Sequence, residues 1–289
     1  MARKSDFKSA ETSIIEFFRT SVIKSFSEKA LNDIFSWKKE EWNISHSKSV
    51  RHLIEFLINE KIILEHTFSY ERGKRKNIYL SGSFDEFTLF SGIQKLSYYT
   101  HYSSMYLHQL TQQIPKTYYL NFEHTSEFPL IMISQKAIDS SFSKEQRKTT
   151  RGYTYKGKRV YLLNGKNTDR LGVIHQFSNT QSYYYTDLER TLIDIAIRPV
   201  YSGGVFDVLG AFNSAKDIVN PVKLHDYLEK LQYIYPYEKV IGFYLERSGY
   251  SEKVLQLFTK KSKYKFYLTY NIKNKEYSKR WNLFYPKGI

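Results

Sequence analysis

The order of segments in the first ninety residues places the strongest constraint on the fold. Apolar residues recur at helical spacing in three successive segments between residues 10 and 60, and we expect Ser27 to be the N-cap of the second segment. Two strand-like segments follow, residues 61–70 and 77–82, joined by the sequence ERGKRK. Three helices followed by a hairpin with a basic tip is the order of a winged helix-turn-helix, which we predict for residues 1–92.

A winged helix would give its third helix and its wing separate roles. The third helix would bury an apolar stripe and turn its polar N-terminal residues toward base edges in the major groove. The candidates on this helix are Lys48, Ser49, Arg51 and His52. The wing would follow the phosphate backbone or an adjacent minor groove, and Gly73 would permit the tight turn at its tip. The candidates on the wing are Arg72, Lys74, Arg75 and Lys76. Double-stranded DNA is therefore the predicted partner.

A basic hairpin tip also occurs as an ordinary solvated turn on a small helical domain. Residues 1–95 carry 16 basic and 13 acidic side chains, so any positive surface there is local. The order of elements around the tip favours DNA binding over the solvated turn.

Most of the net charge of +15 lies in the second part of the chain. Residues 144–170 contain nine basic and two acidic side chains, and residues 256–289 contain nine basic and one acidic. Such blocks indicate an anionic partner, either DNA or an acidic protein surface. The aromatic residues among the last cations are typical of exposed strands, although single-stranded nucleic acid can stack on similar patterns. We expect residues 256–289 to form a basic C-terminal tail.

Cysteine usage and apolar run lengths favour a cytoplasmic location. The chain has no cysteine, which excludes disulfides and thiolate metal sites and suits a reducing compartment. Its first residues have no apolar run typical of a signal peptide, and no apolar run is long enough to span a bilayer. We therefore expect no membrane contact.

Residues 93–289 alternate strand-like and helical segments, which predicts a larger mixed α/β domain and an α+β chain overall. Within it we expect turns at Lys156-Gly157 and Asn164-Gly165, a strand at residues 130–134, and a helix that Asn220 caps with Pro221 at its first position.

The sequence shows no HExxH zinc motif and no G-x-S-x-G elbow. A P-loop-like match ends in Arg159, where the motif needs a magnesium-binding hydroxyl. No glutamate is followed two residues later by lysine, as in many metal-dependent nucleases. We expect no catalytic residue, no metal, no cofactor and no enzyme activity.

Two segments of this domain carry a resemblance to a known family. Residues 183–212 contain Glu189, Arg190 and Asp194 in the sequence ERTLID, followed by Gly203-Gly204. Residues 92–120 contain a helix-like pattern that ends at a proline before a strand. Over roughly residues 10–260 the chain resembles the AbiEi-type antitoxins of bacterial abortive-infection, type IV toxin–antitoxin systems. On composition alone, ERTLID is typical of a core helix whose carboxylates pair with neighbouring arginines, and Gly-Gly of a turn.

The resemblance implies a protein of antiviral defence with two activities. Such proteins are similar to repressors that bind inverted repeats in their own promoter through the N-terminal winged helix. Their C-terminal domain resembles a restriction-endonuclease-like fold without its active site, and it counteracts a nucleotidyltransferase-type toxin. The family supplies no catalytic residues.

Two alternatives remain open at this stage. The chain could be a nucleic-acid-processing enzyme of nuclease type whose site has an unusual pattern. It could also be a winged-helix transcription regulator without a toxin partner. Neither the operator sequence nor the toxin contact surface follows from the sequence.

Overall fold

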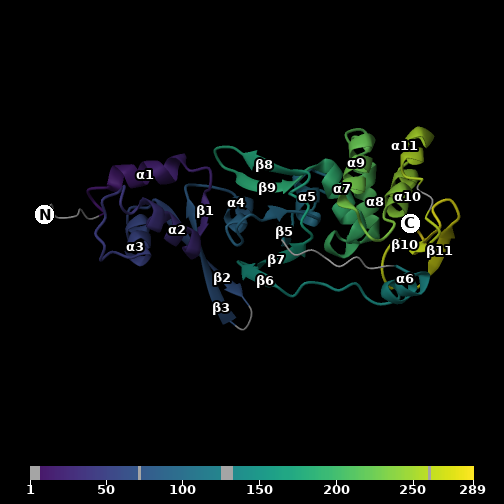
Figure 1. Ribbon diagram of the computed structural model, residues 1–289, viewed down its shortest axis with the longest axis horizontal. Helices are drawn as coiled ribbons and strands as arrows, with labels where there is room; N and C mark the ends of the chain where they lie inside the picture. Colours follow the sequence, from purple (N-terminus) through teal and green to yellow (C-terminus); the bar gives the residue numbers. More distant parts are fainter. Residues whose placement is uncertain (1–6, 71–72, 125–132, 260–261) are drawn as a thin grey trace. The chain divides into compact units, whose positions relative to one another are not determined.

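The computed structural model describes most of the chain, in four stretches. They are residues 7–70, 73–124, 133–259 and 262–289. Helices and strands both contribute throughout, so the fold is mixed α+β (Figure 1).

The chain divides into two compact units. The first unit contains residues 1–97, 151–160 and 175–184, and the second unit contains the remainder. The first unit therefore takes two segments from the later sequence, whereas the sequence predicted contiguous domains 1–92 and 93–289. The sequence around these two segments does not indicate that they join the first unit.

Helices and a sheet make up the first unit. Its elements up to residue 97 are α1 (Glu11–Thr20), β1 (Ser25–Ser27), α2 (Glu28–Lys38), α3 (Val50–Asn59), β2 (Ile63–Tyr70), β3 (Lys74–Ser81) and α4 (Glu86–Ser91). The side chain of Ser27 accepts a hydrogen bond from the backbone N–H of Ala30, so the predicted N-cap of α2 is confirmed. Leu53, Ile54 and Leu57 of α3 are buried, as the helical spacing predicted.

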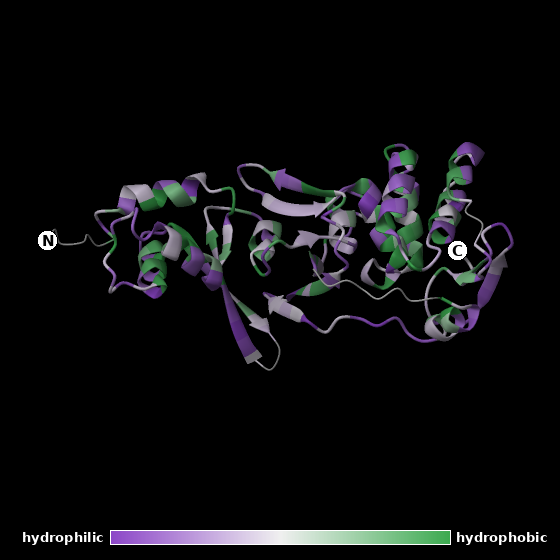
Figure 2. Cartoon of the chain, in the orientation of Figure 1, coloured by the Kyte–Doolittle hydropathy of each residue, from purple (hydrophilic) through white to green (hydrophobic). Residues whose placement is uncertain are grey.

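The β2–β3 hairpin has a continuous antiparallel register from Ile63↔Ser81 to Tyr70↔Lys74, and β1 pairs with the far side of β3. Leu64, Phe68 and Tyr70 lie on one face of β2 in this register, and Leu64 is 57% exposed on that face. Hydrophilic colouring marks the part of the hairpin nearest its tip (Figure 2).

A later strand joins this hairpin in the first unit. β6 (Gly152–Tyr155) pairs antiparallel with β2, and β7 (Lys158–Gly165) follows β6 after a tight turn. The turn residues Lys156 and Gly157 both have positive φ, 45° and 78°, as in the hairpin turn that the sequence predicted. A second turn predicted at Asn164-Gly165 is wrong, because both residues lie in β7.

A second hairpin consists of β8 (Val173–Phe177) and β9 (Ser182–Thr186). Residues 175–184 of this hairpin belong to the first unit. The start of β8 and the end of β9 belong to the second unit.

Helices dominate the second unit. Its elements before the C-terminal region are β4 (Tyr98–Tyr99), α5 (Tyr102–Leu107), β5 (Thr117–Glu123), α6 (Gln135–Phe142), α7 (Leu188–Ile197), the 3-10 helix Pro199–Tyr201, α8 (Val205–Ser214), α9 (Pro221–Leu231), α10 (Glu238–Arg247) and α11 (Glu252–Leu257). β4 pairs antiparallel with β5 and parallel with β9. Asn220 caps α9 and Pro221 occupies its first position, as predicted. A strand predicted at residues 130–134 lies partly outside the described residues.

The C-terminal region, which the sequence predicted as a basic tail, folds into a small sheet. The strands β10 (Phe266–Tyr267), β12 (Leu283–Pro286) and β11 (Lys275–Ser278) lie in that order. Trp281 packs so closely on Gly242 of α10 that a Cβ atom there would collide with the indole ring. The indole N–H also donates to Glu246, 2.7 Å away. Trp281, Leu283 and Tyr285 are therefore part of the hydrophobic core of the second unit.

In the described part of the chain, no helix is both long and apolar enough to cross a membrane.

Candidate functional site

The start of α3 holds the first group of predicted DNA-binding residues. Ser49 precedes the helix, and its backbone N–H donates to Nδ1 of His52 at 3.1 Å, while its hydroxyl lies 2.9 Å from the same nitrogen. Ser49 and His52 are exposed, but these bonds also fix the first turn of the helix. Arg51 is highly exposed, with 86% of its side chain accessible, and it pairs with Glu55 at 3.2 Å. Lys48 is half-buried.

The hairpin tip holds the second group of predicted residues. Lys74 and Arg75 are exposed at the start of β3. Arg72 lies outside the described residues. Lys76 differs from its neighbours, because it is half-buried and its ammonium donates to the backbone oxygen of Ile93 at 2.5 Å. Burial, with the nearby charge of Arg151, lowers the pKa of Lys76.

Aromatic side chains join β6 to the hairpin. The rings of Tyr70 and Tyr153 stack with centroids 4.9 Å apart, and those of Phe68 and Tyr155 at 4.7 Å. The ammonium of Lys76 lies 5.5 Å from the centroid of Tyr153. These contacts bring part of the basic block 144–170 beside the hairpin.

The segment around β6 adds exposed cations that the sequence analysis did not connect to the hairpin. Arg151, Lys156 and Arg159 are exposed in this segment, and Lys158 pairs with Glu86. The density of charge in residues 144–170 was visible in the sequence. Its position was not, because strand pairing between residues 69 and 154 leaves no local pattern.

One face of the hairpin borders a surface hollow of about 970 Å³. Arg75 and Lys76 line it together with Glu28, Asp33 and Glu65. The carboxylates reduce the positive potential on this side, so the hairpin is not uniformly basic.

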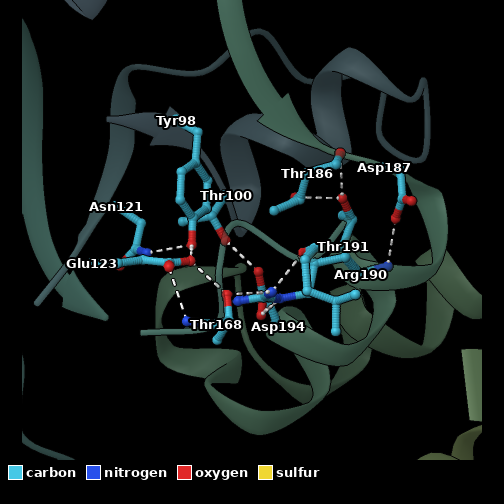
Figure 3. Close-up of polar contacts among 11 residues, drawn as sticks. Tyr98, Thr100, Asn121, Glu123, Thr168, Thr186, Asp187, Arg190, Thr191 and Asp194 are labelled. Atoms are coloured by element: carbon cyan, nitrogen blue, oxygen red, sulfur yellow. Dashed lines mark hydrogen bonds and ion pairs between the residues drawn. The ribbon is translucent and has the colours of Figure 1, made fainter. Parts of the chain in front are cut away.

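The ERTLID motif lies in α7 of the second unit, where its charged side chains are buried. Nε of Arg190 lies 2.9 Å from Oδ1 of Asp194, and both side chains are less than 10% exposed (Figure 3). Arg190 also donates to the backbone oxygen of Leu171 at 2.7 Å and to the hydroxyl of Thr168 at 3.3 Å. The hydroxyl of Thr100 donates to the other oxygen of Asp194 at 2.7 Å. Both oxygens of Asp194, and Nε and Nη1 of Arg190, therefore have hydrogen-bond partners.

Glu123 of β5 extends the same network (Figure 3). It accepts hydrogen bonds from the backbone N–H and hydroxyl of Thr168, the backbone N–H of Arg170 and the hydroxyl of Tyr98. The amide of Asn121 in turn donates to Tyr98 at 2.7 Å. Burial by itself would raise the pKa of Glu123, but these hydrogen bonds outweigh it and lower the pKa overall.

Glu189 is also paired, but with a lysine that is distant in sequence. Its carboxylate lies 2.7 Å from the ammonium of Lys223 and accepts from the backbone N–H of Asn220. Lys223 also pairs with Asp187, the N-cap of α7, and the hydroxyl of Tyr227 donates to Asp187 at 3.0 Å. Burial opposes ionisation of Glu189, yet its bonds to Lys223 and Asn220 lower its pKa. The sequence had suggested arginine partners for both carboxylates, which holds for Asp194 and Arg190.

The Gly203-Gly204 step leads from the 3-10 helix into α8 with positive φ at both residues, 84° and 108°. A Cβ on Gly203 would also collide with the carboxylate of Asp207, whereas the space around Gly204 is open. The two glycines therefore serve the backbone path into α8.

A buried histidine lies beside this network and was not singled out by the sequence. His101 precedes α5 with φ of 54°, and it contacts the rings of Tyr119 and Tyr201. Burial lowers its pKa to about 4, and its buried Nδ1 has no hydrogen-bond partner. The neutral imidazole is the stable form here.

The described residues contain no group of three or more His, Cys, Asp or Glu side chains arranged to hold a metal ion.

No family model and no curated protein matches the chain. Among solved structures, the chain is similar to the crystal structure of the RV2827C protein from Mycobacterium tuberculosis, with a TM-score of 0.52 and 10% sequence identity. The alignment covers 98% of this chain and 93% of that chain. At this identity the likeness concerns the fold alone, and it supports a mixed α+β architecture along nearly the whole chain.

Proposed function

We propose that the chain is a DNA-binding protein whose first unit is a winged helix. The observation that carries this proposal is the pairing of an exposed polar start of α3 with an exposed basic tip of the β2–β3 hairpin in one unit. The order of α1, β1, α2, α3, β2 and β3 supports it, because winged helices use this order.

In this proposal the residues of α3 have unequal roles. Arg51 reaches base edges in the major groove, because 86% of its side chain is exposed. Lys48 contributes at the same end of the helix. Ser49 and His52 hold the first turn, so their replacement would disturb the position of α3 as well as any direct contact.

Lys74 and Arg75 contact phosphates and supply affinity more than sequence preference. Arg151 and Lys156 extend this contact, because β6 lies next to β2. Lys76 orders the hairpin through Ile93, so it is a positioning residue in this proposal.

For the second unit we propose the antitoxin role, which rests on the resemblance of residues 183–212 and 92–120. In that role the chain is a cytoplasmic, non-enzymatic repressor of its own operon, and its second unit counteracts a nucleotidyltransferase-type toxin. The restriction-endonuclease-like architecture belongs to the same proposal. Glu189, Arg190 and Asp194 are buried, so they support the unit that meets the toxin and do not form its contact surface.

Fluorescence anisotropy with a salt series tests the DNA-binding proposal. The probe is a duplex from directly upstream of the gene, and a shuffled duplex is the control. We expect the parent protein to bind the promoter duplex selectively. In Lys74→Ala/Arg75→Ala the slope of log affinity against log salt should be smaller in magnitude by about two, because each lost phosphate contact removes about one released counterion. The matched control, Lys230→Ala/Lys253→Ala, removes two exposed cations from the second unit. Equal slopes in the two double variants would overturn the wing assignment.

Growth of cells that express a neighbouring nucleotidyltransferase-like gene tests the antitoxin role. We expect the full chain to restore growth, and Lys74→Ala/Arg75→Ala to restore it equally, because toxin control needs only the second unit. Growth arrest that the full chain does not relieve would overturn the antitoxin role. Magnesium-dependent cleavage of plasmid DNA by the purified chain would overturn the non-enzymatic assignment.

A further inference from the structure

The β8–β9 hairpin differs in charge from the rest of the chain. Residues 171–186 contain no lysine, arginine, aspartate or glutamate, although a quarter of all residues in the chain are charged. Natural edge strands usually carry lysine, proline or an inward charge that prevents pairing with another chain. This hairpin has none of these features.

Apolar and aromatic side chains are exposed on the hairpin. Phe177 is 56% exposed, Tyr184 is 41% exposed and Ile174 is 39% exposed. The ring of His175 stacks on that of Tyr184 with centroids 4.4 Å apart. This stack lies across β8 and β9, because His175 is opposite Tyr184 in the hairpin.

The hydrogen bonds of the hairpin define which backbone groups face outward. Ser178 donates to the backbone oxygen of Gln181, and Asp187 donates to that of Gly172. These two pairs belong to one uninterrupted antiparallel register, in which hydrogen-bonded pairs alternate with non-hydrogen-bonded pairs. Even-numbered residues of β8 therefore bond to β9, and odd-numbered residues direct their N–H and C=O groups to the other side.

His175 and Phe177 present these outward groups in the middle of β8. Among the described strands, β8 has β9 as its only neighbour and ends the strand order (Figure 1). An open strand edge of this kind is a template for another strand.

We propose that β8 pairs antiparallel with β8 of a second copy of this chain, about a two-fold axis at Gln176. In this register His175 exchanges backbone hydrogen bonds with Phe177 of the second copy, and Phe177 with His175. The two Gln176 residues lie directly opposite each other.

Charge favours a second copy as the occupant. A chain with a net charge of +15 repels its own copies over most of its surface, and this repulsion is weakest where charge is absent. A two-fold axis also matches an inverted repeat in DNA, a point that rests on the proposed function.

The absence of native cysteine allows a direct test by cross-linking. Opposed residues in a non-hydrogen-bonded antiparallel pair have Cα atoms about 4.5 Å apart, within the range that a disulfide spans. We expect Gln176→Cys to form a disulfide-linked dimer under mild oxidation at least about tenfold faster than Gln113→Cys, an exposed site in the second unit that reports random collision. Equal rates for the two variants would overturn the proposal.

Sedimentation of the full chain at up to about 100 µM, with and without the promoter duplex, provides the second measurement, because a short edge contact strengthens when DNA holds two copies together. We expect a dimer that Phe177→Lys weakens by about tenfold or more, since it places two like charges across the axis. Monomers in both conditions, or a dimer unchanged by Phe177→Lys, would overturn the proposal.

Binding of Phe177→Lys to a single half-site separates this inference from the proposed function. We expect its half-site affinity to equal that of the parent. If neither protein selects the promoter sequence, the DNA-binding proposal fails while the cross-linking result still decides the pairing of β8. If both bind the half-site but Gln176→Cys does not cross-link, only the pairing of β8 fails.

Discussion

Arg51 in α3 and Arg190 in α7 each pair with a carboxylate four residues later, yet their surroundings differ. The Arg51–Glu55 side chains are 86% and 57% exposed, whereas those of Arg190–Asp194 are 6% and 9% exposed. The first pair is hydrated and screened, so it contributes little to stability and leaves the arginine available to a ligand. The second pair lies in a buried network, so removing either side chain would leave a buried charge without its partner and destabilise the fold. The same spacing in sequence therefore accompanies an exposed arginine, which we propose contacts DNA, in one unit and a structural residue in the other.

Replacing Arg190 should have the largest effect. Arg190→Met leaves the carboxylate of Asp194 buried without its cation, and we expect a loss of about 3–5 kcal/mol in the free energy of unfolding. Urea unfolding measures this loss. The matched control Arg51→Met should lose under about 0.5 kcal/mol. Similar losses for the two variants would show that burial does not distinguish the pairs.

Acid should act on the second unit through His101. Its pKa is lowered from 6.5 to about 4 in the folded protein, so the unfolded chain takes up the proton first as pH falls. Stability is therefore fully present above pH 6.5 and is lost toward pH 4, by about 3 kcal/mol for a shift of this size. In His101→Asn this loss should be absent, and the carboxylate contribution of Glu123, whose pKa is lowered, should remain and decline below 4.5. Urea unfolding at pH 7 and pH 4 compares the two proteins, and equal pH dependence would contradict the assignment.

Replacing Gly203 or Gly204 by alanine should destabilise the protein by different amounts. Gly204→Ala places an alanine at φ of 108° and ψ of −178°, a backbone region almost confined to glycine, and should cost about 1–3 kcal/mol. Gly203→Ala combines a positive φ with a collision against Asp207 and should cost about 1–3 kcal/mol more than Gly204→Ala. Thermal unfolding of the two variants ranks them. A larger loss for Gly204→Ala would show that the space around the glycines does not decide the cost.

Removal of the hairpin cations should have the smallest effect on stability. We expect Lys74→Ala/Arg75→Ala to change the free energy of unfolding by less than about 0.5 kcal/mol, because both side chains are exposed. DNA affinity should fall in the same variant. A stability loss above about 1 kcal/mol would show that these cations support the fold, as the buried charges of α7 do.

Local signals in the sequence predicted the helices well. Ser27 and the Asn220-Pro221 pair begin their helices where the sequence placed them, because capping depends on neighbouring residues alone. The buried stripe of α3 follows from its spacing for the same reason.

Contacts between distant residues were not predictable in this way. The pairing of β6 with β2 and the packing of Trp281 on Gly242 join residues far apart in sequence. Periodicity also placed Arg190 and Asp194 on a helix without indicating that both faces of α7 are buried. For the candidate site, composition identified the cations of the hairpin but could not separate half-buried Lys76 from exposed Lys74.

The addition of β6 to the hairpin has a consequence for the newly made chain on the ribosome. When residue 97 leaves the exit tunnel, Phe68 and Tyr70 still lack the rings of Tyr155 and Tyr153 that stack on them. Synthesis of roughly sixty further residues, which takes about 3–12 seconds, must follow before β6 is available. During this time the rings of Phe68 and Tyr70 and the edge of β2 stay exposed. A chain truncated after residue 97 would keep that defect permanently and is expected to aggregate.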